Sequence, residues 1–449
     1  MANTYLKRTN GSPTNAYKGT FSAWVKRSAL GSGRIVMNFL DGNNYSYLRI
    51  HPSDFLQLYA VSSGSEYCHL KSNALFRDIN GWSHIVVAID TTLGTTADRI
   101  KVYVNGQQIT SWLEYTGASQ NSNHPLLIAS GTNYHTIGSA ENGTDCWNGL
   151  MSHVHFCDGT ALAPTVFGST DSTTGEWKII TSPSFTLGNN GYTILKDGNT
   201  ITDQSSNSND FTLGGGTLTK TEDCPSNVFC TMNLLDNNIA SSSFSNGNTT
   251  VQTNTSYYTW NTGTLGMTSG KFYWEVKYAA NSNSSIYNLI GIADRPTDGN
   301  TDVLGRQTDC NNYGYYSDNG QSYANNTLAS YGNAYGVGDI IGVAVDLDNS
   351  KIYWSKNGTW QNSGVPTSGS TGTGAVSIVA VSSTLNGYYL PASGDYGSTQ
   401  NCTNQHNFGN GFFGTTAVSS AGANASNNGI FEYDVPAGYT ALSTKGLNL

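Results

Sequence analysis

One pattern occurs twice in this chain and restricts its fold more than any other feature. Residues 89–109 read IDTTLGTTADRIKVYVNGQQI, and residues 345–364 read VDLDNSKIYWSKNGTWQNSG. In each copy an apolar run ends in Asp, a polar gap follows, and an alternating apolar segment leads into Asn-Gly. Alternation places every second side chain on one face of a strand, and Asn-Gly supplies the two positive-φ residues of a tight hairpin turn. The repeat predicts two sandwiches of related architecture, in which it is scaffold rather than active site.

The composition agrees with a chain built from strands and turns. Its 449 residues are enough for about two to four domains. Charged residues make up 11%, against about 25% in a typical soluble domain. Glycine occurs 51 times and tyrosine 27 times, and Asn-Gly recurs along the chain, for example at Asn80, Asn148 and Asn319. No stretch keeps the 3.6-residue apolar period of a helix, so we expect an all-β protein.

Charge and hydropathy exclude several classes of partner. The net charge is −9 and no Lys/Arg cluster occurs, so we expect no nucleic acid partner, because phosphate contacts need positive charge. No apolar run approaches the ~20 residues of a membrane span, so we expect no membrane partner. The start, MANTYLKRTN, lacks the apolar core of a secretory signal peptide. We therefore expect the chain to be made in a cytoplasm.

The seven cysteines are scattered along the chain. An odd and dispersed set fits mostly free thiols. Only Cys224 and Cys230, in DCPSNVFC, are close enough in sequence for a local disulfide, or are a chance pair.

The N-terminal third carries a family resemblance. Short strand patterns follow one another through residues 1–168, with turn residues about every ten positions, as in a β-sandwich. The segments YLKRTNGSPTNAYKGTFSAWVKRS, LFRDINGWSHIVVAIDTT and GLMSHVHFCDGTALAPTVFG together resemble a concanavalin A/laminin-G-like domain. They are most similar to the version found in structural proteins of tailed phages from marine hosts, cyanobacteria among them. The resemblance implies a jelly-roll sandwich over residues 1–168.

A second resemblance covers residues 241–412. The segments GKFYWEVKY, NLIGIAD and YGVGDIIGVAVDLDNSKIYWSKNG resemble the SPRY domain, with Trp274, Glu275 and Val276 on the first strand. The SPRY fold is itself a concanavalin-like sandwich, which accounts for the repeated pattern. Residues 169–240 resemble the segment that follows the laminin-G-like unit in the same phage proteins, and we expect a small β connector there. Residues 413–449 contain Pro436 and Gly438 and are expected to form an extended C-terminal segment.

These resemblances imply a role on a virus particle. We expect a non-enzymatic virion surface protein of a tailed phage, a tail fibre or adhesin whose sandwich loops bind host cell-surface glycan. Its partners would be other virion proteins and that glycan, and it would form a homo-oligomer, with a trimer as the natural guess for a fibre. The alternative is a capsid decoration or tail connector protein that makes only structural protein contacts. A glycan depolymerase is the less favoured third class.

Catalytic patterns are missing from the sequence. Glycoside hydrolysis needs two carboxylates beside the scissile bond, and no two of the seven glutamates lie within twenty residues of each other. They are Glu66, Glu114, Glu141, Glu176, Glu222, Glu275 and Glu432. Two carboxylates from distant strands could still meet in space. There is no G-x-S-x-G motif for a serine nucleophile. We therefore predict that the protein is not an enzyme.

Metal sites are weakly indicated. His153, His155 and Cys157 alternate along one strand, but three ligands strung along a strand span about 14 Å, which is too far for one zinc ion. We predict no metal site and no cofactor, with a structural calcium as the one open possibility. Its candidate ligands are turn aspartates, which also occur in turns for conformational reasons: Asp41, Asp90, Asp98, Asp145 and Asp158.

The best candidate for ligand binding is a tyrosine-rich stretch. Residues 311–335 read NNYGYYSDNGQSYANNTLASYGNAY, a mixture of phenol rings and amides like that of antibody paratopes. The alternative is that these rings lie in strands and fill a sandwich, as aromatic side chains in sheets usually do. Trp112, just past the first hairpin, is a further candidate to stack on a ligand. The candidate set is Tyr313, Tyr316, Tyr323, Tyr331, Tyr335 and Trp112.

Overall fold

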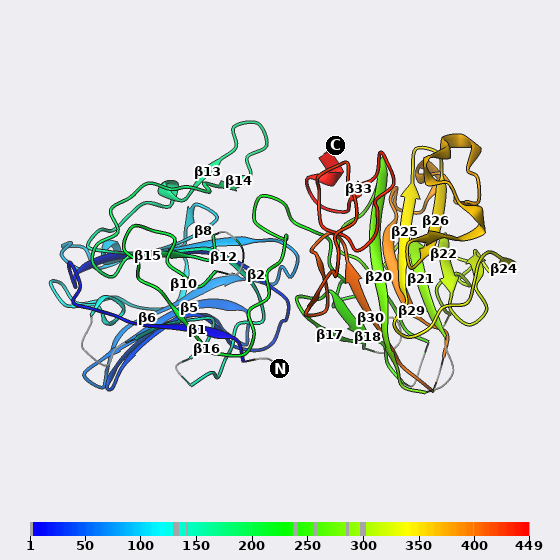
Figure 1. Ribbon diagram of the computed structural model, residues 1–449. Coiled ribbons are helices and arrows are strands. Elements are labelled where there is room, and N and C mark those ends of the chain that lie inside the picture. Colours follow the sequence, from blue (N-terminus) through cyan, green and yellow to red (C-terminus); the bar gives the residue numbers. More distant parts are fainter. Residues whose placement is uncertain are drawn as a thin grey trace. The chain divides into compact units, whose positions relative to one another are not determined.

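The computed structural model divides the chain into two compact units, Met1–Lys220 and Thr221–Leu449. It describes residues 3–128, 134–140, 142–196, 198, 200–236, 241–255, 258–283, 287–296, 302–397 and 399–448, except the side chain of Asp41. Strands dominate both units (Figure 1), so the all-β prediction is confirmed. Within the described residues, no helix is long and apolar enough to cross a membrane.

Unit 1 is a sandwich of an eight-stranded and a six-stranded sheet, seen as two layers in Figure 1. The eight-stranded sheet has the order β10 (Trp112–Thr116), β6 (Ser65–Leu75), β5 (Phe55–Ser62), β4 (Asn44–Ile50), β3 (Arg34–Asp41), β11 (Tyr134–Ile137), β1 (Tyr5–Thr9), β16 (Thr212–Gly215). The six-stranded sheet has the order β15 (Tyr192–Ile194), β12 (Gly149–Asp158), β2 (Lys18–Arg27), β7 (Ser83–Asp90), β8 (Ile100–Val104), β9 (Gln107–Gln108).

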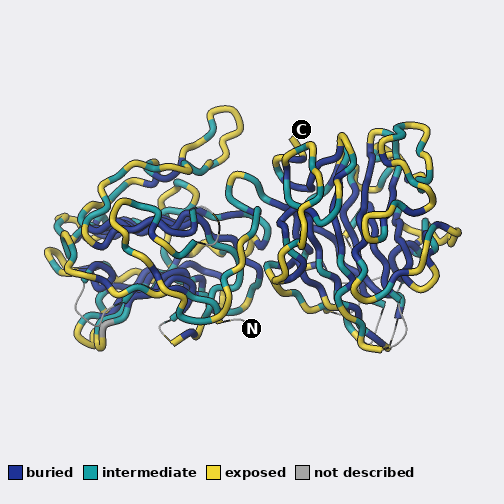
Figure 2. The backbone as a smooth tube through the Cα atoms, viewed as in Figure 1, coloured by how far each residue is buried: buried dark blue, intermediate teal, exposed yellow. Residues whose placement is uncertain are grey.

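Shorter elements complete unit 1. They are the hairpin β13 (Gly168–Thr170) and β14 (Trp177–Ile179), the single-turn helix α1 (Thr96–Arg99), and the 3₁₀ turns Pro125–Leu127 and Pro164–Val166. The core lies where the alternating apolar side chains of both sheets meet, with Phe21, Val36, Leu58, Val87 and Phe156 fully buried. Figure 2 shows the strands buried and the connecting loops exposed.

Unit 2 is a second sandwich. Its nine-stranded sheet has the order β17 (Ser243–Ser245), β18 (Thr250–Gln252), β30 (Cys402–Asn407), β20 (Lys271–Asn281), β25 (Ile340–Asp346), β26 (Lys351–Lys356), β27 (Thr359–Trp360), with β28 (Val376–Ser377) on β26 and β33 (Thr440–Ala441) on β20. The six-stranded sheet has the order β19 (Trp260–Thr262), β29 (Leu390–Asp395), β21 (Asn288–Ala293), β22 (Asn312–Tyr316), β23 (Gln321–Ala324), β24 (Thr327–Ser330).

Unit 2 buries apolar side chains in three clusters, one of which surrounds Trp260 and Leu304. The central core lies between its sheets and contains Trp274 and Trp354. A second cluster covers the other side of the nine-stranded sheet, where Phe431 and Tyr439 of the C-terminal segment pack against Tyr273. The remaining elements are the hairpin β31 (Phe412–Phe413) and β32 (Thr416–Ala417), and the 3₁₀ turns Gln361–Ser363, Pro366–Thr371, Val381–Ser383 and Gly446–Asn448.

The repeated pattern forms equivalent hairpins in the two units. In unit 1, β7 pairs with β8 and β8 with β9; in unit 2, β25 pairs with β26 and β26 with β27. Both Asn-Gly turns are left-handed, with φ of 48° and 77° at Asn105 and Gly106 and of 48° and 78° at Asn357 and Gly358. The sequence prediction of two related sandwiches is confirmed in this detail.

The connector expected over residues 169–240 is not a body of its own. The chain divides at Lys220 and Thr221, so the connector contributes Tyr192 to the core of unit 1 and Cys230 to the core of unit 2. The C-terminal segment is likewise part of unit 2, because β33 pairs with β20 and Tyr439 is buried. All seven cysteines are free thiols, and Cys224 and Cys230 do not form the disulfide that their spacing allowed.

Candidate functional site

A group of tyrosines lies on the outer face of the eight-stranded sheet of unit 1. Leu48, Leu58 and Leu70 point into the core, so the alternating side chains of β4, β5 and β6 point away from it. Tyr47 and Tyr59 face each other across β4 and β5, with ring centroids 5.5 Å apart. Tyr45 lies 6.0 Å from Tyr59.

The register extends this group toward the other end of the sheet. Tyr45 pairs with Leu40 on β3, Leu40 with Tyr134 on β11, and Tyr134 lies on the strand that pairs with β1. All of these side chains are partly exposed. We call Tyr45, Tyr47, Tyr59 and Tyr134 the tyrosine face. These residues span the sheet from β5 to β11, three strand spacings or about 14 Å.

Polar side chains connect the neighbouring strands beside the tyrosines. The Arg49 guanidinium lies 4.8 Å from the Tyr47 ring centroid, and its Nε donates to Gln57 Oε1 at 2.7 Å. The Gln57 amide nitrogen lies 2.7 Å from Nε2 of His69, so it donates to that nitrogen and leaves the ring proton on Nδ1. Burial raises the pKa of Tyr47 and of Tyr59, so both phenols are uncharged at neutral pH and can donate and accept hydrogen bonds.

Two glutamates meet at His69, although they are far apart in sequence. Nδ1 of His69 lies 2.9 Å from Glu114 Oε1 and 3.5 Å from Glu66 Oε2. A glycosidase acid is a carboxyl group that burial holds protonated, whereas the Glu66 and Glu114 side chains are 41% and 44% exposed. A hydrogen bond from Lys71 lowers the pKa of Glu114. Neither carboxyl group of this pair therefore has the burial that such an acid needs.

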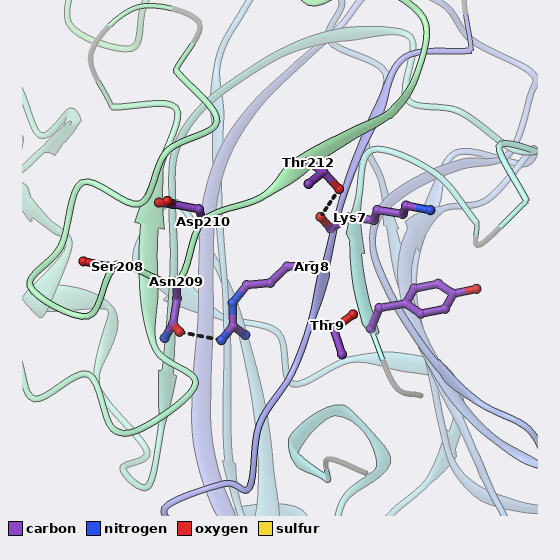
Figure 3. Close-up of a pocket in the computed structure, with 8 residues that line it drawn as sticks. Lys7, Arg8, Thr9, Ser208, Asn209, Asp210 and Thr212 are labelled. Carbon is purple, nitrogen blue, oxygen red and sulfur yellow. Dashed lines mark hydrogen bonds between the residues drawn. The ribbon is translucent and has the colours of Figure 1, made fainter. Parts of the chain in front are cut away.

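A polar pocket of about 390 Å³ adjoins the tyrosine face at β1 and β11. It is lined by Lys7, Arg8, Thr9, Tyr134, Ser208, Asn209, Asp210 and Thr212. Figure 3 shows Arg8 extending toward Asn209, whereas Lys7 extends in the other direction. Nη1 of Arg8 donates to Asn10 Oδ1 at 2.7 Å, and Nη2 donates to Asn209 Oδ1.

The loop 203–210 fixes the far wall of this pocket. Asp203 accepts hydrogen bonds from the backbone N–H groups of Thr193, Ser205 and Asn209. Asp210 in turn accepts the backbone N–H of Asp203 at 2.8 Å. These bonds hold the side chains of the wall in place before any ligand arrives, which reduces the ordering cost of binding.

Two family models match parts of the chain. Residues 1–167 match the concanavalin A-like lectin/glucanases superfamily, and residues 271–387 match the SPRY domain. The chain therefore holds a concanavalin A-like domain and a SPRY domain. The two matches fall within residues 1–168 and 241–412, the ranges that the sequence resemblance gave. The tyrosine face and the pocket walls contributed by β1 and β11 belong to the concanavalin A-like domain.

Solved structures give weaker likenesses, and no curated protein matches the chain in sequence. The SPRY domain of human HERC1 has 15% identity over 39% of this chain and 96% of that chain, with a TM-score of 0.29. A SAP-like pentraxin from Limulus polyphemus has 16% identity over 36% and 72%, with a TM-score of 0.27. A Bacteroides ovatus protein proposed to bind carbohydrate has 15% identity over 49% and 60%, with a TM-score of 0.31. Likeness at this level does not bear on ligand or activity.

The tyrosines predicted from residues 311–335 are buried in the SPRY unit. This stretch is not an open loop, because β22, β23 and β24 occupy most of it. Tyr313, Tyr331 and Tyr335 belong to the central core. Tyr313 lies two positions from the buried Tyr315 and so shares its face. All three side chains are buried, as the alternative that they fill the sandwich expects, and ligand binding by them stays a prediction.

Tyr316 and Tyr323 lie on the opposite side of the same sheet. They belong to a small buried cluster with Trp260 and Leu304. Tyr396 packs on this cluster, and its ring centroid lies 5.3 Å from that of Tyr316 and 6.4 Å from that of Tyr323. Both predicted rings are buried beneath this layer. Ligand binding by either tyrosine remains a prediction that the structure does not test.

The last predicted binding residue, Trp112, also packs inward. It lies on the edge strand β10 and contacts the core of unit 1, half-buried. Its ring lies 6.1 Å from that of Tyr115. Its role in ligand binding stays untested.

The candidate metal ligands do not converge. His155 and Cys157 are buried, and His155 stacks on Phe167. Among the described residues, no group of three or more His, Cys, Asp or Glu side chains is arranged to hold a metal ion. Two of the turn aspartates form ion pairs: Asp90 with Lys18, and Asp98 with Lys101. The side chain of Asp41 lies outside the described residues.

Sequence reasoning missed the tyrosine face and the pocket. The face combines Tyr45, Tyr47 and Tyr59 from two strands with Tyr134 from a third strand, about 75 positions after Tyr59 in the chain. Their alternation in YSYLRI and FLQLYAV could have indicated aromatic side chains on one sheet face. The pocket joins β1 to the loop before β16, some two hundred residues later, and no local pattern predicts such a pairing.

Proposed function

We propose that this protein binds carbohydrate without catalysis, through the tyrosine face and the adjoining pocket of its concanavalin A-like domain. Sugar rings are apolar on one side and hydroxylated at the edge, so they suit phenol rings set among amides and charged donors. The whole domain is of a lectin-like type. The binding role is consistent with both domain families.

One observation carries this proposal: Tyr45, Tyr47 and Tyr59 are partly exposed together on one sheet face beside a polar pocket. Aromatic side chains on the outer face of a sheet remain accessible when nothing in the fold packs on them. The face is about 14 Å wide at the usual strand spacing, long enough for a short run of sugar residues. A chain-like glycan would therefore make several weak contacts at once.

The proposal is tested with single alanine variants and a glycan array. We expect Tyr47→Ala and Tyr59→Ala each to lower affinity for the bound glycan by about tenfold, the effect of losing one good stacking contact. The matched control is Tyr17→Ala, which removes an exposed tyrosine of the same unit. Wild-type protein that binds no glycan on the array, or variants that bind as well as wild type, would contradict the proposal.

We further propose that the protein acts on the exterior of a tailed-phage particle, as a fibre or adhesin in several copies. The resemblance of its segments to phage structural proteins supports this. Weak binding per site would be offset by several tethered copies, because they rebind at high effective concentration. A capsid decoration or tail connector is the competing role.

Gold-labelled antibody on intact particles separates these roles. Label at the tail periphery, together with blocking of adsorption by an antibody against the tyrosine face, is the expected result. Label over the capsid lattice, or adsorption that the antibody leaves unchanged, would favour the structural role.

A further inference from the structure

We propose that His69 and Gln57 are positioning residues of the tyrosine face, and that protonation of His69 weakens carbohydrate binding there. This inference rests on the proposed carbohydrate function and adds the regulation of that binding by pH. It follows from a chain of hydrogen bonds on the outer face of the eight-stranded sheet, in which each donor and acceptor is fixed by its neighbour.

The chain of hydrogen bonds begins at Arg49. Its guanidinium can only donate, so the Gln57 atom that lies 2.7 Å from Arg49 Nε is the amide oxygen. The Gln57 amide nitrogen therefore points the other way, toward His69 Nε2 at 2.7 Å. An amide nitrogen also only donates, so Nε2 of His69 is an acceptor without a proton. The neutral ring thus carries its proton on Nδ1.

The other side of the His69 ring agrees with this tautomer. Nδ1 lies 2.9 Å from Glu114 Oε1 and 3.5 Å from Glu66 Oε2, and carboxylate oxygens accept hydrogen bonds. Tyr59, the partner of His69 on β5, meets the ring edge-on with centroids 4.8 Å apart. Among the described residues, the charged and titratable groups around the ring are Glu66 and Lys71 on β6, Glu114 on β10 and Tyr59 on β5.

Protonation of His69 reverses the role of Nε2. Histidine is the side chain whose ordinary titration falls between pH 5 and 8, and the charged ring donates from both nitrogens. Nε2–H then meets the N–H donors of the Gln57 amide at hydrogen-bond distance. Gln57 and His69 are buried, with 3% and 8% of their surface exposed, so neither can turn to water instead. The Gln57 amide has to turn over, which places its oxygen at His69.

The reversal passes from Gln57 to Arg49. With the amide turned over, its nitrogen faces Arg49 Nε, and two donors cannot bond to each other. Arg49 then loses the bond that holds its guanidinium 4.8 Å from the Tyr47 ring centroid. Tyr47 in turn packs against Tyr59, so this ring pair loses a support on one side. A less ordered face has to be ordered when a sugar binds, which lowers the affinity.

The first test observes the hydrogen bonds without any ligand. NMR on the full chain, with ¹⁵N in the side chains of histidine and arginine, covers the range from about pH 5 to pH 8. At pH 8 we expect Nε2 of His69 to be unprotonated and Arg49 Nε–H to be protected from exchange, relative to free arginine. At pH 5 this protection should be lost. A proton on Nε2 at pH 8, or equal protection of Arg49 at both pH values, would overturn the inference.

The second test measures the binding of a neutral sugar, whose own charge does not change with pH. Calorimetry on the full chain uses cellohexaose and laminarihexaose at pH 5 and pH 8, both above the pH of about 4.3 at which free glutamate titrates. We expect the affinity for the sugar that binds to be about fivefold lower at pH 5, which is the effect of losing about one hydrogen bond.

Three variants assign the pH effect. His69→Gln keeps an acceptor for the Gln57 amide but cannot be protonated, so the ratio of the affinities at pH 8 and pH 5 should fall to about one. Gln57→Glu supplies a carboxylate that accepts from both Arg49 and the protonated ring, so it should also remove the loss at pH 5. The matched control is His51→Gln, which replaces a partly exposed histidine just beyond β4 and should keep the wild-type ratio.

The outcomes separate this inference from the function on which it rests. Equal affinity of the wild type at both pH values, or a loss at pH 5 that His69→Gln keeps, overturns the inference and leaves the carbohydrate function standing. Variants that lose affinity equally at both pH values would show that His69 and Gln57 only support the fold, which also overturns the inference. Binding of neither sugar at either pH contradicts the carbohydrate function, and with it the regulation of that binding.

Discussion

At the scale of single residues, Glu275 shows how a buried carboxylate fastens the C-terminal segment. Its two oxygens accept the backbone N–H groups of Glu432 and Tyr433 at 2.9 and 2.8 Å, and Tyr273 and Asn407 also donate to it. Burial nevertheless raises its pKa to about 7, because these donors only partly replace the lost water. Glu275 thus holds the C-terminal segment through hydrogen bonds, while burial disfavours the ionised form of its carboxyl group.

This raised pKa predicts a pH dependence of stability. Between the unfolded pKa of about 4.3 and the folded pKa, the native state holds a proton that the unfolded chain has released. The contribution of Glu275 to stability is therefore full below about pH 4.3 and is lost as the pH rises to about 7. Its size is on the order of 3 kcal/mol.

We expect Glu275→Gln to flatten the fall in stability between pH 5 and pH 8 that urea unfolding detects in the wild-type protein. The control Glu432→Gln changes a partly exposed carboxylate in the same segment, whose side chain accepts from Ser419, and should leave the slope as it is. An unchanged slope in Glu275→Gln would show that burial at this site does not hold the proton.

At the scale of elements, the Asn-Gly turn of unit 1 is fixed by what packs on it. Gly106 has a φ of +77°, and a Cβ there would lie 2.5 Å from the Trp177 ring. Trp177 lies on β14, and its Nε1 donates to the buried His84 Nδ1 at 3.0 Å. The turn between β8 and β9 therefore needs a glycine for two separate reasons: its positive φ, and the lack of space for a Cβ beside Trp177.

The two reasons can be separated by comparing two glycines. Gly31 has a similar φ of +71° but nothing within 4 Å of an added Cβ. We expect Gly31→Ala to cost about 1 kcal/mol from backbone conformation alone. Gly106→Ala should cost about 2–4 kcal/mol, because overpacking adds to that cost. Urea unfolding measures both, and equal costs would mean that Trp177 moves aside freely.

At the scale of the whole molecule, each sandwich draws on segments outside the matched domain. Tyr192, Ile194 and Phe211 follow the concanavalin A-like match and are buried in its core. Phe431 and Tyr439 follow the SPRY match and cover its nine-stranded sheet. The folding units are therefore longer than the family models at their C-terminal ends.

Fragments test these limits. We expect fragment 1–220 to unfold in one cooperative thermal transition, and fragment 1–168 to be unfolded or strongly destabilised. The loss of the large buried side chains Tyr192 and Phe211 alone would cost several kcal/mol, since each such deletion costs about 3–5 kcal/mol. If fragment 1–168 unfolded at the same temperature as fragment 1–220, the strands after residue 168 would be additions to a complete domain.

The local sequence pattern was sufficient to predict the strands, the turns and the two sandwiches. The alternation in IKVYV and KIYW, followed by Asn-Gly, requires only side-chain direction and turn chemistry, both properties of neighbouring residues. Alternation shows which residues share a face of a strand, but it does not show which face becomes the core. The burial of four candidate residues was therefore harder to predict: Tyr313, Tyr316, Tyr331 and Trp112. Tyr313 was expected to bind a ligand and is instead in the central core.

What the sequence by itself determined is the repertoire: strands, tight turns, two related sandwiches and a surface short of charge. What only the tertiary structure decided is which distant residues meet. His69 contacts both Glu66 and Glu114, and β1 lies beside the loop before β16 at the pocket. Glu275 binds the backbone of a segment some 160 positions away. The physical reason is that strand order and register are set by how whole sheets bury their apolar faces, and that choice has no counterpart in any short stretch of sequence.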